Sequence, residues 1–314
     1  MVSMDEIDIT ISMMLMANSR QPYSDLAELL NMSVNSVHKR VKSLVEIGAL
    51  QNFQTKLSFF LFPNMVNLIM FGESPIKNKK ALINKLGKNE CIYNITQASG
   101  NILFIHAYLE NISELDSLVS FVRKIAEIKE PFIGLDKDML PSNVKIPNDM
   151  NISKLDYLII YSLKDNSRKT ISDISKEIGS STKTIRRHLN RLIEKNLVRF
   201  TVDWYPDKTP QLISMVLLKL NPNIDIDSST LRNKLQEQYG QKLVFNWTFS
   251  NLPNLVLLCV RVNTMREITD IKESLFLMDF ESVDVHILIE GKIYSTWVDT
   301  YLDNKVKELT NGSK

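Results

Sequence analysis

The sequence predicts an α+β protein that contains the same two-domain unit twice. Three observations indicate this fold class. The chain matches itself at a fixed offset of 148 residues, each copy begins with three amphipathic segments at helical spacing, and each copy continues with segments in the order β-α-β-β-α-β. The 314 residues suffice for several domains, and 44% hydrophobic with 24% charged residues is an ordinary globular composition.

The internal repeat aligns residues 8–50 with residues 156–198 without a gap. Several further pairs exchange one apolar residue for another, as Val37 and Ile185 do. A period this long is not that of a solenoid, so it indicates duplication of a whole two-domain unit. Identical pairs include Asp8/Asp156, Ile11/Ile159, Asn18/Asn166, Ser19/Ser167, Arg20/Arg168, Ser24/Ser172, Asp25/Asp173, Ser33/Ser181, Leu44/Leu192 and Glu46/Glu194.

Each copy begins with three predicted helices. Apolar residues at helical spacing place the first helix at about 5–17 and 153–165. A short second helix follows, and a longer third helix runs to about residue 47 in one copy and 195 in the other. A short helix, a tight turn and a longer helix form the helix-turn-helix pattern, and the extended segment that follows is expected to be a wing or exit strand. The expected N-caps of the second and third helices are Ser24, Ser172, Ser33 and Ser181.

The rest of each copy is predicted to alternate strands and helices. In the first copy the segments are 65–71, 77–86, 91–96, 101–109, 112–128 and 131–135. In the second copy they are 212–220, 228–239, 243–249, 254–262, 266–278 and 282–290. The order β-α-β-β-α-β is that of a split ferredoxin-like domain.

These elements give an α+β chain in which two winged helix-turn-helix domains alternate with two ferredoxin-like (βαββαβ) domains. The winged helix-turn-helix domains are predicted at 1–63 and 152–208, and the ferredoxin-like domains at 64–140 and 209–292. A Pro-containing linker is expected at 141–151, and an amphipathic C-terminal helix at 293–314.

Composition excludes several classes of protein. Cys91 and Cys259 lie in apolar runs, which indicates buried, reduced thiols, and the two cysteines and four histidines show no metal-ligand spacing. The start of the chain lacks the basic segment of a signal peptide, and the apolar runs are shorter than the ~20 residues of a membrane helix. We therefore expect a soluble, cytoplasmic protein without a metal, cofactor or membrane partner.

Two stretches resemble the winged helix-turn-helix of the Lrp/AsnC family of archaeal and bacterial transcription regulators. They are "IDITISMMLMANSRQPYSDLAELLNMSVNSVHKRVKSLVEIGAL" (7–50) and "LDYLIIYSLKDNSRKTISDISKEIGSSTKTIRRHLNRLIEKNLVRF" (155–200). Both are similar to the family's opening LD-x-I-L-x-x-L-x-x-[DN]-x-R and to its V-x-x-R-[IV]-x-x-L-x-x-x-G-x-[IL] signature. Family members are usually about half this length, so the chain looks like two family units fused.

The resemblance implies a sequence-specific regulator that binds double-stranded DNA and is not an enzyme. Ferredoxin-like domains of the family pair across a dimer, so it implies an intramolecular pseudo-dimer or a homodimer. We expect the two recognition helices to enter successive major grooves about 34–36 Å apart, with the ferredoxin-like sheets setting that spacing.

The resemblance also implies a small-molecule effector near the turn between the second and third ferredoxin-like strands. The family has G-x-x-D at this turn, and the matching residues here are Gly100 and Asn101 in the first copy and Asn251 and Asn254 in the second. Neither turn has the acid that an α-ammonium group needs, so another ligand and no ligand are equally compatible with the sequence.

The positive charge is concentrated on the second helix-turn-helix. Residues 151–208 hold 12 basic and 7 acidic residues, whereas residues 1–63 hold 5 basic and 6 acidic residues. Lys and Arg contacts to phosphates supply most nonspecific DNA affinity, so we expect the second domain to bind DNA more strongly.

The third helix of each copy carries the candidate DNA-binding residues, because the N-terminal part of such a helix enters the major groove. In the second copy the predicted buried stripe is Ile185, Leu189, Leu192 and Ile193. The residues expected near base edges are Thr182, Lys183, Thr184 and Arg187, and those expected near the DNA backbone are Arg186, His188 and Arg191. In the first copy the candidates are Asn35, Ser36, His38, Lys39 and Lys42. Two interpretations are open for the first copy. Its third helix contacts a second DNA half-site, or it is a degenerate copy that is kept for structure.

Two other functions are compatible with parts of the sequence. The sirohaem decarboxylases also join an Lrp-like helix-turn-helix to a ferredoxin-like domain, but the strands "CIYNITQASG" and "LVFNWTFSN" lack the His and the Arg of that family. A module that senses an effector or binds a protein without binding DNA is the other alternative. The mild acidity of the first copy permits it, and the positive charge of the second copy argues against it.

Overall fold

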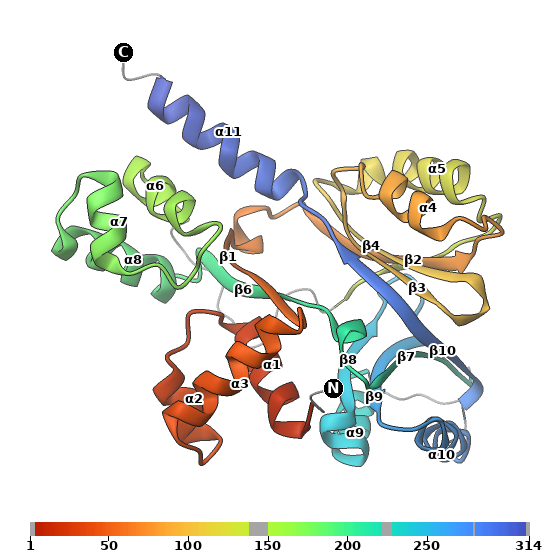
Figure 1. The fold of residues 1–314 in the computed structure, drawn as a ribbon. Helices are drawn as coiled ribbons and strands as arrows, with labels where there is room; N and C mark the ends of the chain where they lie inside the picture. Colours follow the sequence, from red (N-terminus) through yellow and green to blue (C-terminus); the bar gives the residue numbers. More distant parts are fainter. Residues whose placement is uncertain (1–3, 138–149, 222–227, 279, 312–314) are drawn as a thin grey trace. The chain divides into compact units, whose positions relative to one another are not determined.

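The computed structural model describes residues 4–137, 150–221, 228–278 and 280–311. The chain folds into two compact units (Figure 1). The helical unit comprises 5–63, 143–205 and 295–314, and the sheet unit comprises 1–4, 64–142 and 206–294. Both predicted three-helix domains lie in the first unit and both βαββαβ domains in the second. Most of the predicted linker 141–151 falls outside the described residues.

The helical unit contains two three-helix domains, each followed by a strand. The first consists of α1 (Glu6–Ala17), α2 (Tyr23–Leu29), α3 (Val34–Glu46) and β1 (Leu50–Leu57). The second consists of α6 (Lys154–Leu163), α7 (Ile171–Ile178), α8 (Thr182–Glu194) and β6 (Val198–Trp204). The last helix, α11 (Trp297–Asn311), belongs to the same unit.

The second helix of each domain starts earlier than predicted. The predicted caps Ser24 and Ser172 are wrong, because α2 follows Pro22 and α7 follows Thr170. The Thr170 hydroxyl accepts a hydrogen bond from the backbone N–H of Asp173 at 3.1 Å, which satisfies a free donor of the first turn. Ser172 is thereby left inside the helix.

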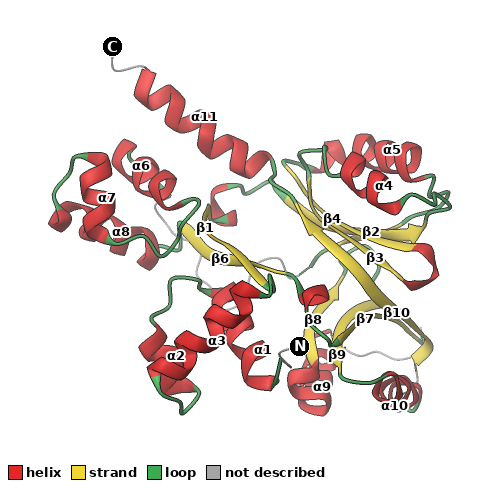
Figure 2. Ribbon diagram, viewed as in Figure 1, coloured by secondary structure: helices red, strands yellow, loops and turns green. Residues whose placement is uncertain are grey.

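A two-stranded antiparallel ribbon joins the two three-helix domains. In it, Phe53 lies opposite Val202 and Gln54 lies opposite Thr201. Phe53 and Thr201 are equivalent positions of the repeat, as are Gln54 and Val202, so a local two-fold axis passes between these pairs. The strands predicted as wing or exit strands therefore pair with each other, and Figure 2 shows them in yellow among the red helices of this unit.

The sheet unit has one eight-stranded sheet with the order β5-β2-β4-β3-β10-β7-β9-β8. The first βαββαβ domain consists of β2 (Val66–Glu73), α4 (Lys79–Leu86), β3 (Ile92–Ala98), β4 (Ile102–Leu109), α5 (Leu115–Ala126) and β5 (Phe132–Leu135). The second consists of β7 (Leu212–Leu220), α9 (Ser228–Tyr239), β8 (Leu243–Thr248), β9 (Leu255–Val262), α10 (Met265–Phe276) and β10 (Phe280–Ile293). Both copies thus have the predicted ferredoxin-like order.

Strand β10 is long enough to join the two halves of the sheet. Its first part pairs with β7, and its last part pairs with β3, where Ile293 lies opposite Asn94. At the other end of the strand order, Asp136 just after β5 forms a bridge with Phe249 just after β8. The second strand of each ferredoxin-like domain therefore meets the last strand of the other.

Each half of the sheet has its own apolar core beneath its helices. In Figure 1, α4 and α5 lie together over β2, β3 and β4, and Leu82, Leu118 and Ile105 contribute to the core between them. In the other half, Leu235 of α9 and Leu275 of α10 contribute to the equivalent core. Every helix among the described residues is too short or too polar to cross a membrane.

Candidate DNA-binding surfaces

Helix α8 is packed on one side and open on the other. Ser181 caps it as predicted, because its hydroxyl accepts a hydrogen bond from the backbone N–H of Thr184 at 3.1 Å. The prediction that Ile193 is buried is wrong, because its side chain is 44% exposed. Ile193 lies about 100° around the axis from Leu192, at the edge of the buried stripe near the end of the helix, and its side chain is left outward. The buried residues of this helix are Ile185, Leu189 and Leu192.

The open face of α8 carries the predicted cations. Lys183, Arg186 and Arg187 are exposed, and no acidic side chain in the described part of the chain forms an ion pair with them. Thr182 is also exposed, whereas Thr184 is half-buried and its hydroxyl is 2.9 Å from that of the cap, Ser181. Cations that are not neutralised within the chain are available to DNA phosphates and to guanine.

A buried carboxylate anchors α8 on α6. Asp156 is fully buried, accepts a hydrogen bond from Nδ1 of His188 at 2.8 Å and forms an ion pair with Arg191. Burial alone raises the pKa of Asp156, but hydrogen bonds from Ser153 and His188 and the charge of Arg191 bring it below its ordinary value. Arg191, which we predicted to contact DNA, therefore has a structural partner inside the domain.

The first domain has the same anchor with a different cation. Asp8 of α1 occupies the repeat position of Asp156 and lies 2.7 Å from Nη1 of Arg40, which stands at the position of His188. The other terminal nitrogen of Arg40 is 2.8 Å from Asp5. Hydrogen bonding to Asp8 and the neighbouring carboxylate charges raise the pKa of Arg40. An acid on the first helix therefore fixes the third helix in both domains.

The open face of α3 offers fewer free cations than that of α8. Its exposed candidates are Asn35, His38, Lys39 and Lys42. Ser36 is half-buried, with its hydroxyl 2.8 Å from that of its cap, Ser33. The His38 ring lies edge-on against the ring of Tyr23, with 5.6 Å between centroids. Lys42 lies 3.7 Å from Glu46 one turn later, so within the described residues Lys39 is the candidate lysine of α3 without an acidic partner.

Four residues on the local two-fold axis hold the two domains together. Ser19 and Arg20 meet their repeat equivalents, Ser167 and Arg168, and the two serine hydroxyls are 2.7 Å apart. The Arg20 guanidinium donates to the carbonyl oxygen of Ser167, and the Arg168 guanidinium donates to that of Ser19 at 2.6 Å. We call these four residues the arginine clamp. These residues are identical in the two copies of the repeat, but the sequence alone indicated no role for them.

The clamp is continuous with the β1–β6 ribbon. The backbone N–H of Ser167 donates to the carbonyl oxygen of Phe53 at 2.9 Å, and that of Ser19 donates to Phe200 at 3.3 Å. Burial and the nearby charge of Arg168 lower the pKa of Arg20. Hydrogen bonds to carbonyl oxygens hold the two arginines in place. These contacts link the two three-helix domains directly, whereas we expected the ferredoxin-like sheets to set the spacing of the recognition helices.

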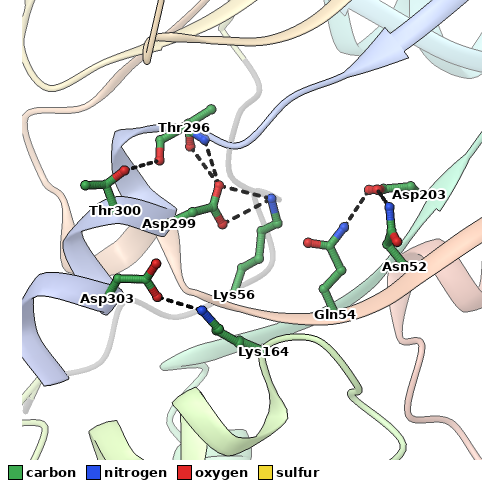
Figure 3. A network of polar contacts seen from close by, with 9 residues as sticks. All are labelled: Asn52, Gln54, Lys56, Lys164, Asp203, Thr296, Asp299, Thr300 and Asp303. Atoms are coloured by element: carbon green, nitrogen blue, oxygen red, sulfur yellow. Dashed lines mark hydrogen bonds and ion pairs between the residues drawn. The ribbon is translucent and has the colours of Figure 1, made fainter. Parts of the chain in front are cut away.

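Helix α11 adds a second link between the domains (Figure 3). Asp299 lies 3.3 Å from Lys56 of β1, which belongs to the first domain. Asp303, one turn later, lies 2.8 Å from Lys164 at the end of α6, which belongs to the second domain. The predicted C-terminal helix is therefore a brace across the ribbon.

A polar group beside this brace spans the ribbon itself. The Asp203 carboxylate of β6 accepts hydrogen bonds from the side-chain amides of Asn52 at 2.8 Å and Gln54 at 2.7 Å (Figure 3). Burial raises the pKa of Asp203, and the two amides oppose that shift. Because the β1–β6 register shifts between Gln51 and Phe53, these side-chain bonds hold the strands together at the irregular point.

The residues predicted near an effector lie in two turns of the sheet unit. Gly100 and Asn101 turn between β3 and β4 with φ of 71° and 59°. The Asn251 side chain accepts a hydrogen bond from the backbone of β5 and donates another to it, each at 2.8 Å, so it serves the joint between the two halves. The Asn254 carbonyl oxygen accepts from the backbone N–H of Leu220 at 2.8 Å. The described residues contain no acid, histidine or cysteine cluster that could hold a metal.

Titratable side chains are buried in the sheet unit. His106 of β4 lies 3.3 Å from the Tyr93 hydroxyl, and its ring centroid is 5.6 Å from that of Trp247 in the other half. Burial lowers the pKa of His106 to about 4 and raises that of the Cys259 thiol to about 12. At neutral pH the imidazole is thus neutral and the thiol protonated, as expected of core residues. Cys259 is buried as predicted, and Cys91 is half-buried.

Comparisons with known proteins agree with this geometry. The winged helix-turn-helix DNA-binding family matches residues 4–51 and 152–199, which contain the three helices of each copy. An uncharacterised HTH-type transcriptional regulator from Pyrococcus abyssi is 28% identical over 130 residues, which are 40% of this chain and 87% of the relative. The regulator LysM of Sulfurisphaera tokodaii is 23% identical over 126 residues, which are 40% of this chain and 89% of that protein.

The fold is also found in a solved enzyme structure. The crystal structure of the sirohaem decarboxylase NirDL has a TM-score of 0.57, with 97% of this chain and 99% of that chain covered and 11% sequence identity. At this identity the likeness concerns the fold alone. The chain thus carries two winged helix-turn-helix DNA-binding domains. In this chain each of these domains is followed by a ferredoxin-like domain.

Proposed function

We propose that the chain is a cytoplasmic transcription regulator of Lrp/AsnC type that binds specific sequences of double-stranded DNA. The observation that carries the proposal is the open face of α8 on the third helix of a winged helix-turn-helix, where three exposed cations have no acidic partner among the described residues. The serine cap, the buried apolar stripe and the ion pair with the buried Asp156 fix this helix. The exposed cations therefore project from a helix that is held rigidly in its domain. The similar HTH-type regulators support the same function.

The helical unit supports an intramolecular pseudo-dimer. The ribbon, the arginine clamp and α11 join the two winged helix-turn-helix domains, so one chain supplies both recognition helices. A dimeric helix-turn-helix protein binds two half-sites about one helical turn apart. We propose that this chain does so alone, and that an effector bound to the sheet unit acts on the regulator without supplying DNA contacts.

A gel-shift titration of the wild type and an R20A/R168A variant tests both parts of this proposal. The wild type is expected to bind a duplex of about 40 base pairs with an affinity that falls log-linearly with salt. The variant loses the reciprocal bonds of the clamp, and two linked modules lose avidity when their geometry is no longer fixed. We expect its affinity for the duplex to fall by about tenfold or more.

A K77A/K80A variant is the matched control, because it removes two exposed lysines from the sheet unit and leaves the clamp intact. Its affinity should stay within about twofold of the wild type. Wild-type affinity that does not change with salt would rule out DNA binding of this kind. Equal affinities of the clamp variant and the wild type would instead show that the clamp does not set the geometry of the two domains on DNA.

A tetrapyrrole enzyme is the second candidate, favoured by the whole-chain likeness to NirDL, which was also crystallised with an iron-uroporphyrin III analogue. Against it, the strands β3 and β8 lack the His and Arg that the decarboxylases carry. Adding iron-uroporphyrin III to the purified chain distinguishes the two functions. A regulator leaves the absorbance band of the free tetrapyrrole unchanged, whereas a saturable shift of that band would favour the enzyme.

A further inference from the structure

We infer, building on the proposed function, that the two recognition helices recognise different half-sites and that the operator is asymmetric. Helix α3 selects a half-site with specified A·T pairs, and helix α8 selects one with specified guanines. The inference rests on two recognition helices that are held in equivalent ways but present different side chains to the DNA.

The two helices are held in equivalent ways, each by a serine cap and by an acid on the first helix of its domain. Each has 13 residues and begins after a serine cap, Ser33 for α3 and Ser181 for α8. Each is anchored by the acid at the same repeat position, Asp8 or Asp156. The local two-fold axis of the ribbon relates the two domains. Equivalent positions of α3 and α8 therefore face equivalent positions of a duplex, and any difference in recognition lies in the side chains.

The first turn of α3 presents an apolar residue and an amide. Val34 is 50% exposed, and Asn35 beside it is also exposed. In the major groove an apolar side chain contacts the methyl group of thymine, and an asparagine amide bonds to N6 and N7 of adenine. The next residue, Ser36, is occupied by its cap. Both free residues of this turn therefore favour A·T pairs.

The first turn of α8 presents different chemistry at the same positions. Thr182 stands at the position of Val34 and Lys183 at that of Asn35, and both are exposed. Arg187, one turn further on, is exposed and has no acidic partner among the described residues, but α3 has the exposed Lys39 at the same repeat position, so the two helices differ chiefly in the first turn. Lysine and arginine bond to O6 and N7 of guanine, and arginine does so through two parallel bonds. These side chains favour guanine.

The residue after the first turn strengthens the difference. His38 and Arg186 share a repeat position, but the His38 ring rests against the ring of Tyr23. The Arg168 guanidinium also lies against Tyr23, 4.1 Å from its ring centroid. Arg186 has no such partner among the described residues, because Ile171 takes the place of the tyrosine. At this position α8 thus offers a free cation to the duplex and α3 does not.

Selection of bound duplexes from a random pool by the full chain tests the inference. The enriched sequences should contain two dissimilar blocks centred about 10 base pairs apart, one with specified A·T pairs and one with specified guanines. A palindromic motif, or a motif with one specified block, would overturn the inference and leave DNA binding intact. A pool from which nothing is retained or enriched would overturn the proposed function itself.

Exchange of the first-turn residues assigns each block to its helix. The variant V34T/N35K gives α3 the side chains of α8 at exposed positions, and T182V/K183N makes the reverse exchange. We expect the first variant to select guanines in both blocks and to bind the wild-type operator about tenfold more weakly. The second should select A·T pairs in both blocks. Unchanged motifs from variants with wild-type unfolding midpoints would contradict the assignment.

Discussion

Replacing Arg186 and Arg187 with alanine lowers the affinity of the chain for duplex DNA by about 10- to 100-fold at moderate salt. Both guanidinium groups are exposed on α8 and lack acidic partners among the described residues. Each phosphate contact contributes about 0.9 to the slope of log affinity against log salt, and a base contact contributes about 1–3 kcal/mol. The double variant should therefore also reduce that slope, by up to about 2.

Neither arginine belongs to the anchor of α8, so the R186A/R187A variant should unfold at the wild-type midpoint. Arg191 is unsuitable for this test because it pairs with buried Asp156, and its loss would change stability and binding together. The K77A/K80A variant again controls for the change in net charge. If R186A/R187A keeps both the affinity and the salt slope of the wild type, α8 does not contact DNA.

Replacing Asp156 with alanine destabilises the second winged helix-turn-helix domain by about 3–5 kcal/mol, because it leaves His188 and Arg191 without their buried carboxylate. The same change at Asp8 should cost less, since it affects one cation and Arg40 keeps Asp5 as a partner. Urea unfolding followed by far-UV circular dichroism measures both effects. Equal losses in the two variants would contradict the anchor that we describe.

The effect of D156A depends on pH in a defined direction. The pKa of Asp156 is lower in the folded chain than in an unfolded one, where an aspartate titrates near 3.9. The stabilisation is therefore complete above about pH 4 and is lost as the pH falls through the lower, folded value. The difference in stability between the wild type and D156A should shrink in acid. A difference that grows in acid would show that the carboxylate is not held in its charged form.

Local patterns in the sequence predicted most of the fold. Ser33 and Ser181 were recognisable as caps because a serine precedes an amphipathic run. The apolar segments predicted the order of strands and helices along the chain. Which strands pair between the copies could not be predicted, because β1 joins β6 and β3 joins β10 over long separations in the chain. Ser172 was mistaken for a cap because Thr170, two residues earlier, is an equally good one.

The candidate site was predictable in outline. An apolar stripe with cations opposite it indicated the recognition face, and Lys183, Arg186 and Arg187 are on that face. Sequence spacing could not show that Arg191 turns back to Asp156, because the acid lies 35 residues earlier and only the packing of α6 on α8 brings them together. The arginine clamp was hidden for a related reason. Its bonds go to backbone carbonyl oxygens, which any residue provides.

The central claim is that one chain places two recognition helices on one duplex. Hydroxyl-radical footprinting of the full chain on its selected duplex, at a measured binding ratio, tests it most directly. We predict one chain per duplex and two protected segments about 10 base pairs apart on one face of the DNA, centred on the two half-sites. A single protected segment at this ratio, or two segments that require two chains, would contradict the claim.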